Sequence, residues 1–336
     1  MESKSSYPIC RLNNNIIQIL KKIVSSDIMG NINTGLENEI RMIDDGEHLT
    51  TIACVCPNPL NGHSKVTLST AYCQFFWLIV DVAMKISDRC IIEESCSEFG
   101  ISLNDFMQQS EIIRKMPKDL LQMKLNISGG IKADQFIDYF NSIHEILDSS
   151  FWEQMESEYS HAKSILEKSS VIDFKAINNY DLNTKYHERV NSIYCYGIAF
   201  ILLHELSHHS LGHVLKQNIN RVEDEGVADM SAFWSIYNDI IGEERFSANA
   251  AIMFVFFSFM ELDPSLKEDG IHPREDKRLF AIYDLIKDEN KKYTDLLVRL
   301  LDFWAINNNV AGFPVNLPCT TDSVNKIRAF FEKYNK

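Results

Sequence analysis

The sequence predicts an α+β fold that is predominantly helical, with one small β-hairpin. Apolar residues recur every three or four positions along most of the chain, for example at Ile16, Ile19, Leu20 and Ile23. Residues 50–69 are the exception, because two β-rich runs at 51–56 and 64–69 flank a segment of Pro, Asn and Gly. Histidines and carboxylates at 204–229 predict a pair of neighbouring helices that bring these side chains together.

The helical pattern divides into nine further segments. They are expected at about 70–87, 104–125, 132–168, 185–216, 221–241, 247–262, 273–288, 291–305 and 323–335. No repeat or low-complexity linker separates them, so residues 1–336 are interpreted as a single domain. Residues 88–184 are polar and helical without a chemical motif, which favours a helical insertion or a substrate-selecting or regulatory region.

Composition excludes several classes of protein. Hydrophobic residues make up 45% of the chain and charged residues 24%, which is typical of soluble globular proteins. A net charge of -14 without any basic run argues against binding of nucleic acid. The apolar stretches are shorter than the roughly 20 residues that cross a bilayer, so no contact with a membrane is expected.

The first residues and the cysteines indicate a cytoplasmic location. Residues 1–6 lack the basic start, apolar stretch and cleavage site of a secretory signal. The eight cysteines are scattered without a CxxC pair, so free thiols are expected.

His204, Glu205 and His208 form an HExxH motif within a segment of predicted helix. Histidines four residues apart lie on the same helical face, so both imidazoles can reach one Zn²⁺ ion. Glu205 lies about 100° around the helix from His204, where it can address a water molecule at the open side of the metal.

A second helix carries the carboxylates that complete the motif. Residues 216–220 are polar and suit a tight turn, and a helical pattern follows from Arg221. If the two helices fold back about this turn, His208 faces Glu225 and His204 faces Asp229. Glu225 then supplies a third ligand, while Asp229 orients His204 through its other ring nitrogen.

Two histidines and one carboxylate leave a fourth position on zinc, which is the catalytic rather than the structural pattern. Glu205 is expected to take a proton from water as it attacks a peptide carbonyl and to pass it to the leaving amine. The expected cofactor is therefore Zn²⁺ and the expected partner a protein or peptide substrate.

Charge that develops on the carbonyl oxygen needs preplaced donors, and the segment from Ile271 to Arg278 offers them. His272 precedes a proline, which disfavours helical backbone and places it just ahead of a helix. His272, Arg274 and Arg278 are the candidates; a capping role for His272 and a solvated Arg278 are the simpler alternatives.

These motifs together resemble the gluzincin metallopeptidases, over roughly residues 193–290. The resemblance rests on HExxH at 204–208, the ExxAD run at 225–229, and an HP at 272–273 with Arg278 six residues after the histidine. It is close to the prenyl-protein and HtpX-type peptidases, and it implies a zincin-like fold, a transition-state role for His272 and a supporting role for Arg278. His213 matches a third histidine found in several of these peptidases, which implies that it supports the ligands.

The relatives named above usually have membrane helices and a longer segment between HExxH and the glutamate, and this chain has neither. Its compact organisation is more similar to the Lit-type phage-exclusion peptidases, whose target is the translation factor EF-Tu. That resemblance implies a cytoplasmic protease in antiviral defence that stays inactive until an activating peptide or protein triggers it. The hairpin at 50–69 would then form the substrate-side sheet, where an extended peptide adds as a strand.

Two other functions remain open at this point. One is a regulator resembling the ImmA/IrrE-type peptidases, which have a similarly short gap to the third ligand. The other is a non-enzymatic module in which zinc only staples two helices. Glu205 argues against the second, because a structural site has no use for that carboxylate and usually closes its fourth position with Cys or His.

Overall fold

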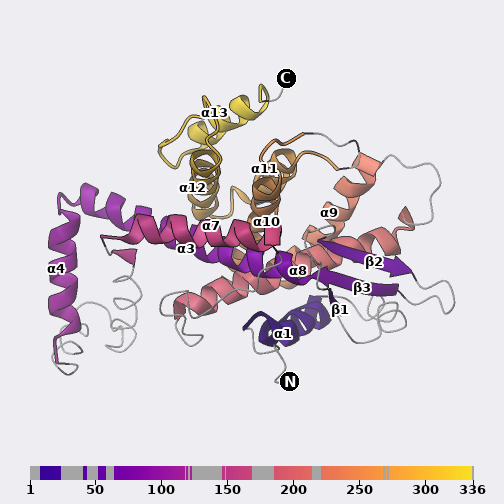
Figure 1. Cartoon of the computed structure of the whole chain (residues 1–336), viewed down its shortest axis with the longest axis horizontal. Helices are drawn as coiled ribbons and strands as arrows, with labels where there is room; N and C mark the ends of the chain where they lie inside the picture. Colours follow the sequence, from indigo (N-terminus) through magenta and orange to yellow (C-terminus); the bar gives the residue numbers. More distant parts are fainter. Residues whose placement is uncertain are drawn as a thin grey trace.

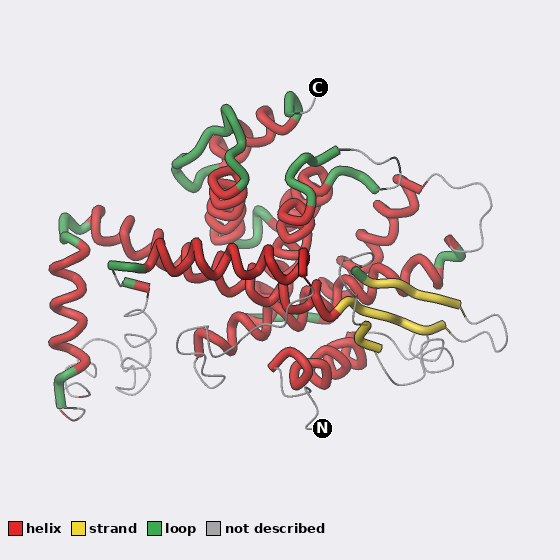
Figure 2. Tube along the Cα trace, in the orientation of Figure 1, coloured by secondary structure: helices red, strands yellow, loops and turns green. Residues whose placement is uncertain are grey.

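The computed structural model describes residues 8–23, 41–43, 52–57, 64–117, 119, 122, 146–147, 149–168, 185–213, 221–267, 270 and 272–334. Within these ranges the chain is mainly helical, with a small sheet at one end (Figures 1 and 2). The helices are α1 (Pro8–Ile23), α3 (Thr70–Glu98), α4 (Leu103–Arg114), α7 (Phe151–Lys168), α8 (Lys185–Ser210), α9 (Arg221–Asp239), α10 (Glu243–Leu262), α11 (Glu275–Ile286), α12 (Lys292–Asn307) and α13 (Thr321–Phe331). The predicted helical predominance is confirmed.

The sheet has three strands in the order β1-β3-β2. β2 (Ala53–Pro57) pairs antiparallel with β3 (Ser64–Ser69), as the predicted hairpin requires, and its turn at 58–63 lies outside the described residues. β1 (Arg41–Ile43) adds in parallel on the other side of β3. This short strand was not predicted, because three residues are too few to show an alternating pattern.

Three long helices, α3, α8 and α10, form the centre of the protein. Helix α3 begins directly after β3, where the Ser69 side chain accepts a hydrogen bond from the Tyr72 amide and caps the helix. From Ala248 to Glu261 almost every residue of α10 is buried, so this segment is mostly apolar on all sides of the helix. Among the described residues α10 alone is long and apolar enough to cross a membrane, but most of it is buried inside the protein, the position of a core helix.

Gly197 allows α8 to approach α3 closely. A Cβ atom at this position would lie 2.5 Å from the ring of Phe76, and 3.2 Å from Val255 of α10. Glycine is therefore required for the packing of these helices, and it lies two turns before His204 on α8.

The region of residues 88–184 is attached to the core through α7. Lys85 of α3 lies 2.7 Å from Asp81 on its own helix and 2.9 Å from Glu158 of α7, and this cluster is largely buried. Helix α4 lies at the end of the molecule away from the sheet (Figure 1).

Several predicted helix boundaries were wrong, each for a local reason. The helix from 70 continues to Glu98 because its apolar spacing persists at Ile92 and Cys96, which are buried. The helix expected to reach 125 ends at Arg114, three residues before Pro117. The helix expected over 132–168 is interrupted by a turn that includes Ser149 and Ser150, and residues 132–145 lie outside the described part.

Helix α8 ends at Ser210 rather than at 216. Gly212 adopts a φ of +70°, a left-handed conformation that ends helices and that glycine adopts without steric cost. The chain turns back at this point, and this turn places His213.

Candidate active site

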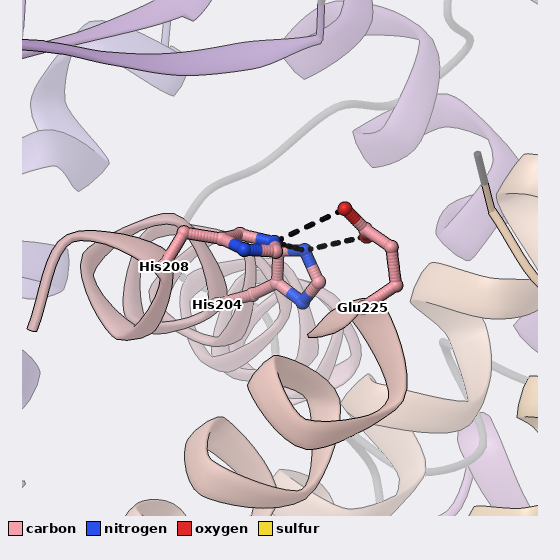
Figure 3. A group of neighbouring side chains, drawn as sticks. All are labelled: His204, His208 and Glu225. Atoms are coloured by element: carbon pink, nitrogen blue, oxygen red, sulfur yellow. Dashed lines mark hydrogen bonds and ion pairs between the residues drawn. The ribbon is translucent and has the colours of Figure 1, made fainter. Parts of the chain in front are cut away.

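The two histidines of the HExxH motif lie on the same face of α8, near its carboxyl end (Figure 3). Their Nε2 atoms are 3.1 Å apart, and both side chains are largely buried. The hydrophobic segment from Ile198 to Leu203 buries the preceding turns of the helix and holds it against the core.

Helix α9 packs against α8 through small side chains. Ala228 and Ala232 are fully buried, and the Ser207 hydroxyl of α8 donates a hydrogen bond to the Ser231 hydroxyl of α9 at 3.0 Å. Small residues allow the two backbones to lie close together, so the carboxylates of α9 reach the histidines of α8.

Glu225 joins the two histidines as predicted. Its Oε2 lies 3.2 Å from His204 Nε2, and its Oε1 lies 3.2 Å from His208 Nε2. The ligand-type atoms of these three residues all lie within 4.8 Å of one another, so the group could hold a metal ion. Figure 3 shows the carboxylate facing both imidazoles across the gap between the helices.

Asp229 lies behind His204, on the side opposite Glu225. Its Oδ1 is 2.8 Å from His204 Nδ1, the atom that the predicted helix pairing assigns to it. Arg278 of α11 holds this carboxylate from the other side, with Nε–Oδ2 and Nη2–Oδ1 distances of 2.7 Å. The guanidinium also lies over the rings of Phe256 and Phe259, at 4.7 and 5.7 Å from their centroids. Arg278 is therefore buried and paired with Asp229 rather than solvated.

Electrostatics of the cluster follow from burial and close contacts. Burial alone would lower the pKa of His204, but its contacts with Asp229 and Glu225 outweigh this and raise the pKa to about 9. Burial would raise the pKa of Glu225, yet the two histidines hold it well below its usual range. In the metal-free protein this cluster therefore binds a proton near neutral pH.

Glu205 lies beside the histidines and is partly buried. Burial raises the pKa of its carboxyl, and the neighbouring His204 and His208 only partly offset this effect. A carboxylate with a raised pKa is better suited to accept a proton and release it again.

His272 lies just ahead of α11, as its position before Pro273 predicts. Its side chain is 45% exposed and its Nε2 is 3.9 Å from Glu225 Oε1, so it borders the cluster from the solvent side. Arg274 does not contact the cluster. Its guanidinium pairs with the Asp276 carboxylate and donates hydrogen bonds to the backbone carbonyls of Phe331 and Tyr334.

His213 reaches the cluster from the turn after α8. Its Nδ1 lies 3.0 Å from His208 Nδ1, and its Nε2 lies 3.2 Å from Asp224 Oδ1. Sequence reasoning gave His213 a supporting role but did not identify Asp224. Asp224 directly precedes the predicted ligand Glu225, and this position could have suggested it. The predicted helix pairing did not include the turn after α8, however, and this turn brings His213 to Asp224.

A comparison with protein-family models finds one family that matches most of the chain. The model for Peptidase U49 matches residues 66–298, which include α3, the hairpin strand end, the histidines, the carboxylates of α9 and Arg278. The chain belongs to the peptidase U49 family. As a U49 peptidase it hydrolyses peptide bonds, and its substrate is a protein or peptide. Neither a curated protein nor a solved structure matches the chain.

Proposed function

We propose that this U49 peptidase is a zinc-dependent endopeptidase with a zincin-like, gluzincin-type active site. The observation that carries this proposal is the convergence of the ligand-type atoms: the two Nε2 atoms lie 3.1 Å apart, and each lies 3.2 Å from one of the two oxygens of the Glu225 carboxylate. Tetrahedral zinc with bonds of about 2.0–2.1 Å requires ligand atoms separated by about 3.3–3.4 Å. The donor set of two imidazoles and one carboxylate fits Zn²⁺ and leaves one position open.

Each neighbouring residue has a distinct role in this proposal. A bound Zn²⁺ supplies Lewis-acid chemistry, polarising a carbonyl oxygen and lowering the pKa of water. Glu205 accepts the proton from the attacking water and delivers it to the leaving amine. His272 donates a hydrogen bond to the carbonyl oxygen as charge develops there. Asp229, held by Arg278, orients His204.

The proposal is tested with Glu205→Gln, which keeps the shape of the side chain and removes its basicity. Zinc content measured on the purified protein is expected to equal that of the wild type, while proteolysis disappears. Glu188→Gln is the matched control, since Glu188 is exposed near the start of the same helix. Because the substrate is unknown, new protein termini are compared across the proteome of cells that express each variant. Full activity in Glu205→Gln, or identical termini in wild type and variant, contradicts the mechanism.

The physiological role proposed with this activity is exclusion of phage by cleavage of a translation factor. It is supported by the resemblance of the chain's compact organisation to that of the Lit-type peptidases. Incubation of the purified protein with EF-Tu, with and without extract of phage-infected cells as a source of the activating peptide or protein, is the direct test. An intact EF-Tu under every condition, together with other cleaved proteins in the proteome comparison, excludes this role and leaves the peptidase.

A further inference from the structure

The histidines of the proposed zinc site are supported in different ways. His204 Nδ1 lies directly on the Asp229 carboxylate, 2.8 Å from Oδ1. His208 Nδ1 instead lies on a second imidazole, that of His213, at 3.0 Å. The chain continues from His213 Nε2 to Asp224 Oδ1 at 3.2 Å. His208 is therefore connected to a carboxylate through one intervening side chain.

The backbone builds this connection from two local features. Gly212, with φ of +70°, ends α8 and turns the chain so that His213 folds back beside the last turn, with its ring 5.2 Å from that of His208. Asp224 and Glu225 are consecutive near the start of α9. The Asp224 carboxylate faces His213, and the Glu225 carboxylate faces His204 and His208. His213 is only 8% exposed, which excludes most of the water that would otherwise satisfy its nitrogens.

The direction of the hydrogen bonds follows from the inventory of donors and acceptors. A metal ligand uses the lone pair of His208 Nε2, so the ring carries its proton on Nδ1. That proton needs an acceptor, and the nearest is Nδ1 of His213. His213 then carries its own proton on Nε2 and donates it to Asp224, which as a carboxylate only accepts. One assignment of protons satisfies all three groups.

We infer that Asp224 and His213 act in series as positioning residues that fix the ring orientation and tautomer of His208, so that its Nε2 lone pair is directed at the metal. This inference rests on the proposed zinc function and identifies the residues that orient His208. A carboxylate linked to a ligand histidine raises its basicity and holds its orientation, and loss of such a partner typically costs 10–100-fold in metal affinity.

The test measures zinc affinity of the full chain by competition with a chromophoric chelator. His213→Leu and Asp224→Ala are each expected to weaken zinc binding by about 10–100-fold. His213→Asn is expected to recover most of this loss, because its Oδ1 can replace Nδ1 as the acceptor for His208. Glu223→Gln is the matched control: Glu223 is the exposed acidic neighbour of Asp224, and its affinity should equal that of the wild type.

The double variant separates a series from two independent contributions. If the two residues act through one another, His213→Leu with Asp224→Ala weakens binding no more than the stronger single variant does. Thermal unfolding of the metal-free proteins shows which variants are folded. If His213→Leu does not fold, the zinc affinities of Asp224→Ala and His213→Asn test the inference. Three results would each overturn the inference. The single variants could bind zinc with wild-type affinity, the losses in affinity could add in the double variant, or His213→Asn could bind zinc as weakly as His213→Leu.

The same measurement distinguishes failure of this inference from failure of the proposed function. A wild-type chain that binds no zinc overturns both. A wild-type chain that binds zinc tightly, with His213 and Asp224 variants indistinguishable from Glu223→Gln, overturns the series alone and leaves the zinc site intact.

Discussion

Arg278 grips both carboxylate oxygens of Asp229, with two N–O distances of 2.7 Å, in a part of the protein where both side chains are almost fully buried. The pair links α11 to α9 directly behind His204. Bidentate pairing of this kind fixes geometry as well as charge. The orientation of His204, a proposed metal ligand, therefore depends on Arg278, which lies 49 residues after Asp229 in the chain.

Replacement of Arg278 by Met is expected to destabilise the metal-free protein by about 3–5 kcal/mol, because it leaves the Asp229 carboxylate buried without its partner. Arg278→Lys keeps the charge but loses one arm of the pair, so its loss should be smaller. Denaturant unfolding measures both. Lys326→Ala, which breaks an exposed ion pair with Asp322 on α13, is the control and should change stability by about 0–1 kcal/mol. Equal effects at the two positions would contradict a structural role for the buried pair.

Glu225→Ala is expected to lose stoichiometric zinc, because it removes one of three protein ligands. The measurement is metal analysis after dialysis, with Glu223→Ala as the control on the exposed face of the same helix turn. Retention of one zinc ion per chain in Glu225→Ala would place the third ligand elsewhere.

Zinc binding is expected to be strongly pH-dependent. In the metal-free protein the pKa of His204 is raised to about 9, so below this pH the metal must displace a proton. Apparent zinc affinity should therefore rise with pH, by about tenfold per unit below about pH 9 if one proton is released. Chelator competition at several pH values, corrected for protonation of the chelator, measures this slope. An affinity independent of pH between 6 and 8 disagrees with a proton held between His204 and its carboxylates.

His272→Ala is expected to retain zinc and stability while kcat falls by about 10²–10³, the usual effect of losing one donor to the developing oxyanion. Stability should be preserved because the side chain is half exposed. His161→Ala on α7, an element that contributes nothing to the cluster, is the matched histidine control. A loss confined to KM would instead assign His272 to substrate binding.

Gly197→Ala is expected to destabilise the protein by about 1–3 kcal/mol, since its Cβ would overlap the Phe76 ring. Gly226→Ala on α9 is the matched control, because a Cβ there meets nothing within 4 Å. In that open position alanine should stabilise the helix by about 0.5–1 kcal/mol. Thermal or denaturant unfolding of the two variants should therefore give changes of opposite sign.

Local patterns in the sequence were sufficient for much of the site. The spacing of His204 and His208 placed two imidazoles on one helical face, and the spacing of Glu225 and Asp229 did the same for two carboxylates. A symmetric turn between these helices correctly paired His204 with Asp229 and His208 with Glu225. Helix ends were less well predicted, because they depend on single residues such as Gly212 and Pro117 rather than on periodicity.

The sequence by itself determined the helical character of this protein, the hairpin and the identities of the residues that meet between α8 and α9, since all of these follow from short-range spacing. Only the tertiary structure decided what surrounds them. It placed Arg278 on Asp229, turned His213 back onto His208 and brought Asp224 to His213, while directing Arg274 away to the C-terminal helix. These contacts join helices and turns whose separation is set by side-chain packing and backbone φ angles, and no periodic pattern records either quantity.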